Sequence, residues 1–415
     1  MKTVPWIFAS LLLALMLLAG ATLLALRAVL APLPGEWSVP LALGPFPIQA
    51  GVPSLVRLAT SAWGGPLLDG RRLPTRHGVL HLSWTDAQGL AVRCAPCLLQ
   101  PPGLGEEPLR LPEVRLTVRR LGEQLWGRFE SGRVRGEWKG KLGAQGIELR
   151  LVVPETPLAD GYALFAADIP ELAQARIEGR FSLAARLALP QGRLELQPRV
   201  EGFEVHGLGT EAWLGARSTC GPAPRRLAAD SWIARAVVAA EDQRFHEHPG
   251  YDLAEVSASL ARNQQARKVT RGGSTLTQQL AKLLVAGDER HAARKLRELL
   301  YALEMERTLG KARILRLYLE HAPWGSGVCG AEAAARHYFG VRAHELTPSQ
   351  AVWLAAMLHN PQLEAHRWAA SGEINLARAQ WVALGLRGVP RSQRLALAED
   401  LAVLDWKPWW AQPGQ

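Results

Sequence analysis

EDQRFHEHPGYD occupies residues 241–252, GGSTLTQQLAK residues 272–282 and RKLRELLYALE residues 294–304. Two carboxylates in this part of the chain, Glu241 and Glu298, stand among basic side chains. A carboxylate can take a proton from a sugar hydroxyl, and clustered cations can hold a departing phosphate group. The combination favours glycosyl transfer from a phosphate-activated sugar, because hydrolysis of a plain glycosidic bond needs paired carboxylates and no phosphate site.

Five motifs follow one another between about Asp230 and Pro361, roughly a third of the chain. They are Glu241-Asp242 with Phe245, His248 and Gly250; Gly272 to Lys282; Arg294-Lys295 with Glu298; Ile314-Leu315 with Tyr318-Leu319; and the run AAARHYFG that ends at Gly340. Ordered motifs at matching spacing are far more specific than any one of them. This stretch resembles the peptidoglycan glycosyltransferases (glycosyltransferase family 51), which form the transglycosylase module of penicillin-binding proteins and also occur as monofunctional enzymes.

The resemblance implies a lysozyme-like, mainly α-helical domain with peptidoglycan glycosyltransferase activity. Such an enzyme polymerises lipid II onto a lipid-linked growing chain as β-1,4 glycan strands and releases undecaprenyl pyrophosphate. Glu241 would be the general base towards the sugar 4-hydroxyl of the acceptor, with a pKa raised by partial burial. Glu298 would be the second catalytic carboxylate, orienting the cations or the sugar-phosphate donor.

Other residues of the motifs are expected to bind the substrate. They are Asp242, Phe245, His248, Ser274, Thr275, Gln278, Gln279, Lys282, Arg290, Arg294 and Lys295. The Arg side chains can grip a phosphate through two parallel hydrogen bonds, and the Lys side chains act as point charges. No cofactor is required. A divalent cation, Mg²⁺ or Mn²⁺, could share the charge neutralisation, but no cluster of metal ligands in the sequence calls for one.

Three positions depart from the family pattern. Leu283 stands where the family usually has Asn, and Arg316 and Glu320 replace the Glu and Asn of the fourth motif. These departures support an alternative, a catalytically degenerate domain that acts as a binding or scaffold partner through the rest of the chain. A third interpretation, a lytic transglycosylase or lysozyme-like hydrolase, leaves the basic residues without a role. We favour the enzyme, because both carboxylates and the cations are retained.

The first residues of the chain predict a membrane anchor. Val4–Leu26 is a run of 23 residues without a charged side chain, enough to cross a bilayer as a helix. A cleavable signal peptide competes, since Ala19-Gly20-Ala21 has the small-x-small form, but the apolar run continues past it. We therefore expect an uncleaved, single-pass anchor over residues 1–30. The resemblance places the catalytic domain on the outer, periplasmic face of the bacterial cytoplasmic membrane.

The net charge of +10 suits an anionic partner. Nucleic acid is not indicated, because the chain has no long Lys/Arg block, no aromatic stacking motif and no zinc-finger spacing. Anionic lipid headgroups and a pyrophosphate substrate explain the charge with fewer assumptions.

Residues 31–210 read as a β-rich accessory domain. Apolar and polar residues alternate in 147–151 (IELRL), 194–197 (LELQ) and 203–205 (FEV). Short alternating runs broken by Gly and Pro predict half-buried antiparallel strands, and Pro190-Gln191-Gly192 predicts a hairpin turn. The region contains no catalytic motif. It could be a scaffold, a module that binds cell-wall synthesis or envelope proteins, or a curved sheet in contact with lipid.

Helical periodicity begins after residue 226. Ile233, Ala236, Val237 and Ala240 fall at i, i+3, i+4 and i+7, which predicts a short helix with Glu241 at its end. Thr347-Pro348-Ser349-Gln350 predicts a helix start, and that helix should stop before Asn360-Pro361. On a helical wheel Glu298 lies opposite the apolar stripe that contains Leu296, together with Arg294.

The predicted architecture is therefore multi-domain. It comprises an anchor (1–30), the β-rich accessory domain (31–210), a linker (211–226), a glycosyltransferase family 51-like domain (227–370) and a C-terminal Trp-containing tail (371–415). Chains of this length can support two domains with separate cores.

The four cysteines are Cys94, Cys97, Cys220 and Cys329. Cys94 and Cys97 have redox or zinc spacing, but neither a second metal pair nor a βαβ pattern accompanies them. We expect a small local disulfide in an oxidising compartment. Cys329, close to the fifth motif, is expected to be a small buried apolar residue.

Overall fold

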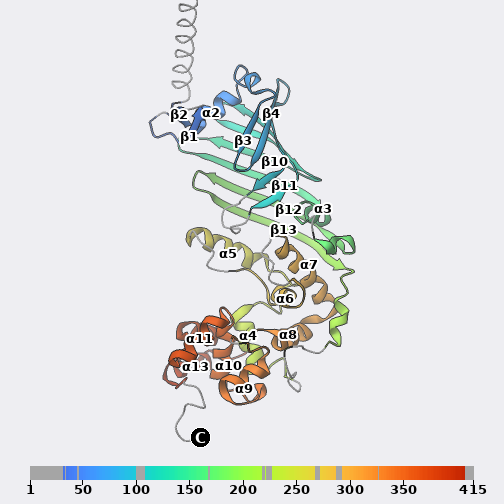
Figure 1. Ribbon diagram of the computed structural model, residues 1–415, viewed down its shortest axis with the longest axis vertical. Helices are drawn as coiled ribbons and strands as arrows, with labels where there is room; N and C mark the ends of the chain where they lie inside the picture. The colour runs from blue at the N-terminus through green and yellow to red at the C-terminus, as the bar shows by residue number, and fades with distance from the viewer. Residues whose placement is uncertain are drawn as a thin grey trace, which may run out of the picture. The chain divides into compact units, whose positions relative to one another are not determined.

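The computed structural model describes residues 31–32, 34–43, 46–99, 108–166, 169–216, 220, 227–266, 272–286, 292–325 and 327–406 (Figure 1). The predicted anchor, Arg290 and the chain beyond residue 406 lie outside these residues, as does most of the predicted linker. Within the described ranges, no helix combines the length and apolar character needed to span a bilayer.

The chain divides into two compact units. The first consists of Met1–Phe165, Arg180–Glu201 and Gln264–Val269, and the second of Ala166–Gly179, Gly202–Asn263 and Thr270–Gln415. A β-sheet dominates the described part of the first unit and helices dominate the second, which confirms a β-rich region followed by a helical one. The boundaries of the predicted domains stay predictions.

The main sheet has nine strands in the order β13-β12-β11-β10-β9-β8-β5-β4-β3. Their bounds are β3 (Arg72–Thr75), β4 (Gly78–Thr85), β5 (Gly89–Cys94), β8 (Val114–Leu121), β9 (Gln124–Ser131), β10 (Val134–Leu142), β11 (Ile147–Pro157), β12 (Arg176–Leu189) and β13 (Arg193–His206). Two small antiparallel pairs accompany it, β1 (Ser38–Leu43) with β2 (Phe46–Gly51) and β6 (Cys97–Leu99) with β7 (Leu109–Leu111).

The predicted alternation of strand residues is confirmed. Residues 147–151 form the start of β11, and both 194–197 and 203–205 lie in the single long strand β13. The predicted turn at 190–192 joins β12 to β13. In β10, Val134, Trp138 and Leu142 are buried while the charged residues between them are exposed, as expected for a sheet with one covered face.

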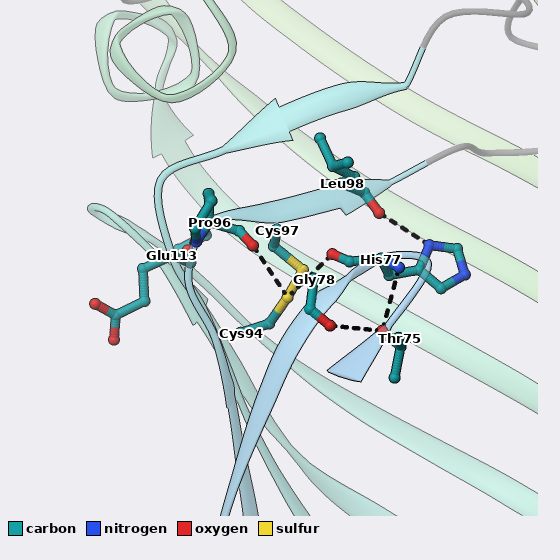
Figure 2. The surroundings of a disulfide bond; sticks show 9 residues. Thr75, His77, Gly78, Cys94, Pro96, Cys97, Leu98 and Glu113 are labelled. Carbon is teal, nitrogen blue, oxygen red and sulfur yellow. Dashed lines mark hydrogen bonds between the residues drawn. A yellow bond between two sulfur atoms is a disulfide. The ribbon is translucent and has the colours of Figure 1, made fainter. Parts of the chain in front are cut away.

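Two clusters of apolar residues cover that face of the sheet. In one, α2 (Val52–Ala59) places Val52 and Val56 against Trp138 and its neighbours. In the other, α3 (Leu158–Phe165) contributes Leu164 beside the Cys94–Cys97 disulfide. This bond, drawn in Figure 2 beside the turn between β3 and β4, confirms the predicted local disulfide.

The second unit contains the helices that carry the sequence motifs. Their bounds are α4 (Trp232–Glu241), α5 (Leu253–Ala266), α6 (Leu276–Ala281), α7 (Ala292–Thr308), α8 (Gly310–His321), α9 (Ala331–Phe339), α10 (Pro348–Met357), α11 (Pro361–Ser371), α12 (Leu376–Gly385) and α13 (Arg391–Val403). The shorter elements of the chain are η1 (Pro66–Leu68), η2 (Pro170–Ala173), η3 (Thr210–Leu214), the π-helix η4 (Lys282–Ala286) and η5 (Ala343–Glu345).

Two helix predictions are confirmed. The four apolar residues predicted to face the core from α4 are all buried, and Glu241 is its last residue. Helix α10 begins with the predicted capping box between Thr347 and Gln350 and ends at Met357, before Asn360-Pro361. Every residue from 351 to 357 is buried, so α10 is a central element of the helical core.

Residues 371–403, predicted as part of a tail, contain α12 and α13. Ala379, Val382 and Leu401 are buried in the same core as α4 and α10, and α12 packs against both of those helices. The following Trp406 donates its indole N–H to the carbonyl of Leu401 at 3.1 Å. The core of the helical unit therefore extends about thirty residues beyond residue 370, where the predicted glycosyltransferase domain ends.

The described part of the predicted linker, together with the residues just before it, is bound to α7 and α8. The carboxylate of Glu304, 1% exposed, accepts the backbone N–H groups of Leu208 at 2.9 Å and Thr210 at 3.3 Å. The guanidinium of Arg313 donates to the carbonyls of Trp213 at 2.8 Å and Ala216 at 2.7 Å. These contacts satisfy a buried charge that would otherwise be costly.

The expectation for Cys329 is wrong, because this residue forms a disulfide with Cys220 rather than a buried thiol. The two cysteines are 109 positions apart, and pairing over such a separation leaves no local signal in a single sequence. The bond closes a loop that contains both Glu241 and Glu298.

We predict that the two disulfides differ in their contribution to stability. In the chain-entropy model, removing Cys220–Cys329 costs about 5 kcal/mol and removing Cys94–Cys97 roughly 1.5 kcal/mol, because the closed loops differ in length. Paired Cys→Ser variants of each bond should therefore show a much larger loss of unfolding free energy for the first pair in denaturant titrations. Equal losses would show that loop closure does not govern either contribution.

Candidate active site

A cleft of about 1110 Å³ opens in the helical unit, and most of the predicted site residues line it. Those that do are Glu241, Asp242, Ser274, Thr275, Gln279, Lys282, Arg294, Lys295 and Glu298. Side chains that were not predicted as site residues complete the wall, among them Arg244, Asp252, Tyr318, His359, Arg378 and Trp381. The cleft is thus rich in charges of both signs.

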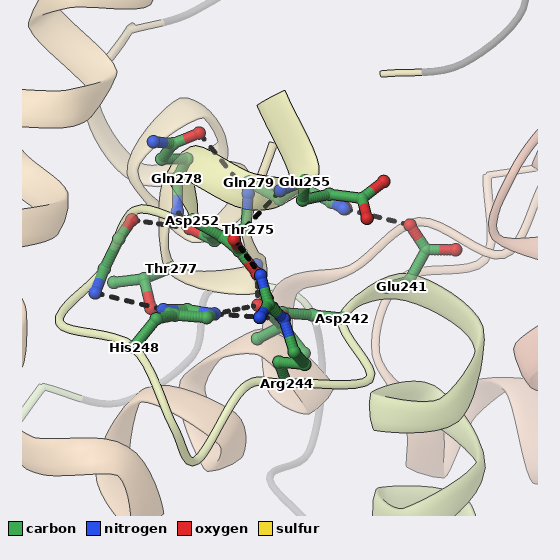
Figure 3. Close-up of polar contacts among 12 residues, drawn as sticks. Glu241, Asp242, Arg244, His248, Asp252, Glu255, Thr275, Thr277, Gln278 and Gln279 are labelled. Atoms are coloured by element: carbon green, nitrogen blue, oxygen red, sulfur yellow. Dashed lines mark hydrogen bonds and ion pairs between the residues drawn. The ribbon is translucent and has the colours of Figure 1, made fainter. Parts of the chain in front are cut away.

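Glu241 stands at the C-terminal end of α4 with its side chain 12% exposed. Its Oε2 accepts a hydrogen bond from Nε2 of Gln279 at 2.9 Å (Figure 3), and Nη2 of Arg378 lies 3.7 Å from its Oε1. Burial raises the pKa of Glu241, whereas Gln279, Arg378 and His359 partly offset that effect. The predicted direction of the pKa shift is therefore confirmed, and its cause is desolvation of the ionised form.

Asp242 joins the end of α4 to the start of α6. Its carboxylate contacts Nε2 of His248 at 3.0 Å and accepts the backbone N–H of Leu276, the first residue of α6, at 2.9 Å (Figure 3). The backbone N–H of Gly250 donates to Nδ1 of His248, so the ring proton is on Nε2 and points at Asp242. Asp242 and His248 thus fix the position of α6.

The N-terminus of α6 is tied down in several ways. Thr275 and Gln278 form a capping box, and the Thr275 hydroxyl also donates to the carbonyl of Gly250 at 2.7 Å. This arrangement satisfies N–H groups that the first turn of any helix leaves unpaired. It also sets Gln279, the next residue, on the side of α6 that faces Glu241.

Three predicted substrate-binding residues lie behind the cleft wall. Phe245 is fully buried, and His248 and Gln278 are 9% and 7% exposed. Nζ of Lys311 sits 4.4 Å from the centre of the Phe245 ring and donates to the carbonyl of His248 at 2.7 Å. In this structure these side chains support the loop that carries Asp242.

Glu298 contacts two basic residues of its own helix, α7. Its Oε2 accepts a hydrogen bond from Nζ of Lys295 at 2.6 Å, and Nε of Arg294 lies 3.5 Å from its Oε1. Lys295 also donates to Oγ of Ser274 at 2.5 Å. The side chain of Glu298 is 1% exposed, so the face of α7 opposite the predicted apolar stripe is buried at this position. Because α6 also packs against α7, this face of the helix is covered as well.

Arg378 is the main site residue that sequence reasoning missed. It belongs to α12, and it donates to the carbonyl of Ala240 at 2.8 Å while its guanidinium lies 4.4 Å from the centre of the Trp381 ring. No local pattern links α12 to Glu241, which is more than a hundred residues earlier. Tyr318, by contrast, was within the fourth motif, but nothing in that motif indicated its contact with Gln279.

The three departures from the family pattern occupy different environments. Leu283 lines the cleft and is 39% exposed. Arg316 is exposed and Glu320 is 8% exposed, and neither is part of the cleft wall. Of the three, Leu283 alone is therefore placed to affect a bound substrate directly.

A group of potential metal ligands lies elsewhere in the second unit. Carboxylate or imidazole atoms of Glu178, Glu204 and His206 lie within 4.8 Å of one another on β12 and β13. In the part of the chain that the structure describes, no comparable group of three lies in the cleft. The charge neutralisation available there comes from Lys and Arg side chains.

Residues 227–385 match a family model described as Transglycosylase. The match covers α4 to α12, and it confirms for this part of the chain the resemblance drawn from the five motifs. It extends past residue 370 to include Arg378.

Several bacterial proteins named biosynthetic peptidoglycan transglycosylase are similar to this chain. That of Nitrosomonas eutropha is 47% identical over 136 residues, which are 32% of this chain and 56% of the relative. Those of Alcanivorax borkumensis and Bordetella avium are 45% identical over 151 residues and 48% identical over 140 residues. These two matches cover 36% and 32% of this chain and 61% and 58% of the relatives. The chain thus spans somewhat more than half the length of these relatives.

We predict opposite stability effects from neutralising the two carboxylates. A carboxyl whose pKa is higher in the folded than in the unfolded state adds stability below its unfolded pKa, and this is lost as pH rises through the folded pKa. At neutral pH Glu241 is therefore a destabilising charge, and Glu241→Gln should raise the melting temperature. The gain should disappear in acid, where both states are protonated.

Glu298→Gln is the matched control, because it breaks an ion pair in which Glu298 is buried and should lower the melting temperature. Calorimetry across the pH range measures both effects. A lower melting temperature for Glu241→Gln at neutral pH would contradict the assignment of Glu241 as an incompletely compensated charge.

Proposed function

We propose that this protein is a peptidoglycan glycosyltransferase that polymerises lipid II into β-1,4 glycan strands. The observation that carries the proposal is a buried carboxylate with a raised pKa, Glu241, in the same cleft as Lys282, Arg294 and Lys295. A base and a cationic cluster are the two groups that glycosyl transfer from a pyrophosphate donor requires. The similarity of residues 227–385 to transglycosylases supports the same reaction.

In the proposed reaction Glu241 accepts the proton of the sugar 4-hydroxyl of the acceptor lipid II. The resulting oxygen attacks the anomeric carbon of the lipid-linked growing chain, and the bond from that carbon to the pyrophosphate oxygen breaks. One displacement inverts the α-linked donor to a β-1,4 product. Undecaprenyl pyrophosphate leaves with the bonding electron pair and its charge is neutralised by cations.

The cations for this step come from two elements. Lys282 follows the last residue of α6 as its C-cap, and Arg294 and Lys295 stand on the first turn of α7, where both contact Glu298. Glu298 is thereby assigned to orienting the cations, since it is occupied by two basic side chains and is less suited to proton transfer. A hydrolase would have no use for these cations, and this argues against the lytic alternative.

The direct test is incubation of the full chain with labelled lipid II in detergent. Polymer is the expected product. No change would indicate the degenerate scaffold, with Leu283 in the cleft as its cause, and cleavage confined to preformed glycan would indicate a hydrolase.

Lys282→Ala should raise the lipid II concentration needed for half-maximal rate, and added salt should increase it further. A wild-type concentration dependence would exclude Lys282 from substrate capture.

Glu241→Gln should nearly abolish polymerisation, because the amide keeps the shape of the side chain but cannot accept a proton. Loss of a general base typically costs on the order of 10²–10⁴ in rate. Glu399→Gln, at an exposed position on α13, provides the matched control and should retain the wild-type rate. Near-normal turnover by Glu241→Gln would remove Glu241 from the role of base.

We also propose that residues 1–30 anchor the protein in the bacterial cytoplasmic membrane as a single pass, with the helical unit on the periplasmic face. The uncharged run Val4–Leu26 supports the anchor, and two disulfides suit an oxidising compartment.

For the β-rich unit we propose contact with cell-wall synthesis or other envelope proteins. Equal capture of such proteins by chains with and without this unit would exclude that contact.

The membrane placement predicts that the protein stays in the membrane fraction after carbonate washing and that protease added to intact spheroplasts digests the helical unit. An anchored chain facing the periplasm meets both conditions, because carbonate removes only peripheral proteins. Protection from protease until the spheroplasts are lysed would place the helical unit on the cytoplasmic side.

A further inference from the structure

A chain of two hydrogen bonds links a buried tyrosine to Glu241. The hydroxyl of Tyr318, on α8, donates to Oε1 of Gln279 at 2.8 Å. Nε2 of the same Gln279 amide then donates to Oε2 of Glu241 at 2.9 Å, as Figure 3 shows. Three separate helices, α8, α6 and α4, therefore contribute one residue each to the chain.

The chemistry of the three groups fixes the direction of both bonds. Burial raises the pKa of the Tyr318 hydroxyl well above its usual range, with the charge of Glu241 adding to the effect, so the hydroxyl keeps its proton. An ionised carboxylate only accepts hydrogen bonds. If the Gln279 amide turned over, its carbonyl oxygen would face the Glu241 carboxylate, and the two acceptors would repel each other. The Tyr318 proton therefore selects the amide orientation that donates to Glu241.

The two oxygens of Glu241 are consequently different. Oε2 is occupied by the Gln279 amide, whereas buried Oε1 has no hydrogen-bond partner among the described residues. The nearest cation to Oε1 is Arg378, at 3.7 Å, beyond hydrogen-bond distance. A proton arriving at Oε1 would leave the bond from Gln279 to Oε2 intact, so the chain suits both protonation states of the base.

We propose that Tyr318, acting through Gln279, is a positioning residue that holds the carboxylate of Glu241 in the orientation in which it accepts the acceptor's hydroxyl proton. That Glu241 accepts a proton from the substrate rests on the proposed function. The orientation of the carboxylate itself rests only on the two hydrogen bonds and on the burial of Tyr318.

Tyr318→Phe tests the proposal, because it removes one oxygen and leaves the ring in place. In lipid II polymerisation the variant should lose roughly threefold to tenfold in kcat, the effect of one hydrogen bond, with little change in KM. The acid limb of its pH–rate profile should move to higher pH, since the hydrogen bond from Gln279 is one of the contacts that lower the pKa of Glu241. Unchanged kcat and an unchanged acid limb would overturn the proposal.

Tyr338→Phe is the matched control. The Tyr338 hydroxyl is also buried and donates to a backbone carbonyl, that of Trp324, at 2.6 Å, but the residue is not part of the cleft wall. It should lower stability without moving the pH–rate profile. If Tyr318→Phe and Tyr338→Phe have the same effect on the pH–rate profile, the role of Tyr318 is only structural.

A double-mutant cycle with Gln279→Met tests whether Tyr318 acts through Gln279. Methionine keeps the length of the side chain but neither accepts from Tyr318 nor donates to Glu241. In this background Tyr318→Phe should cause almost no further loss of kcat, whereas independent contributions would multiply. Multiplying effects would overturn the proposed chain.

A titration that needs no activity separates this proposal from the proposed function. Glutamate labelled with ¹³C at the carboxyl carbon, with the Glu241 signal assigned by its absence in Glu241→Gln, reports the pKa of Glu241 directly. That pKa should rise in Tyr318→Phe and stay at the wild-type value in Tyr338→Phe. A wild-type protein that makes no polymer would contradict the proposed function. An unchanged pKa of Glu241 in Tyr318→Phe would contradict the positioning role of Tyr318.

Discussion

The carboxylate of Asp242 is the contact on which the geometry of the site depends. It follows Glu241 directly and holds the first N–H of α6 together with the His248 ring. Because α6 has only six residues, it has little stability of its own and is held by its contacts. Fixing its first turn to the end of α4 places Gln279 beside Glu241 and Lys282 at the far end of the same short helix. Glu241 and Lys282 are thus brought to their places by the contacts of a single carboxylate.

The motif residues were predictable from sequence, and the contacts that tune them were not. Periodicity and capping gave α4 with Glu241 at its end, and α10 between Thr347 and Asn360, because such signals are local. Alternation gave the strands β11 and β13 for the same reason. Arg378 beside Glu241, and Cys220 bonded to Cys329, depend on pairs far apart in the chain, for which one sequence carries no spacing signal. The burial of Glu298 was missed because one apolar stripe does not reveal a second covered face.

Glu241 and Glu298 show how burial can serve two purposes. The Glu298 carboxylate is almost fully buried but accepts a hydrogen bond from Lys295 and lies close to Arg294, so its charge is largely compensated. Glu241 receives one neutral amide donor and a cation at 3.7 Å. Because the charge of Glu241 is only partly compensated, ionised Glu241 lowers the stability of the folded protein. The same free energy raises the affinity of Glu241 for a proton. The destabilising position is therefore the one suited to proton transfer.

Asp252 in the same cleft shows how closer pairing with a guanidinium would change the pKa of Glu241. Burial alone would raise the pKa of Asp252, but hydrogen bonds from the Arg244 guanidinium, one of them 2.8 Å long, and from the backbone N–H of Glu255 outweigh it and the pKa is lowered. A carboxylate so paired is a poor proton acceptor near neutral pH. Arg378 is kept from pairing with Glu241 in this way, since it also donates to the carbonyl of Ala240 and stacks over Trp381. The two acids in this cleft thus have opposite pKa shifts: the pKa of Glu241 is raised and that of Asp252 is lowered. The difference follows the distance of the nearest guanidinium, which is 3.7 Å from Glu241 but within hydrogen-bond distance of Asp252.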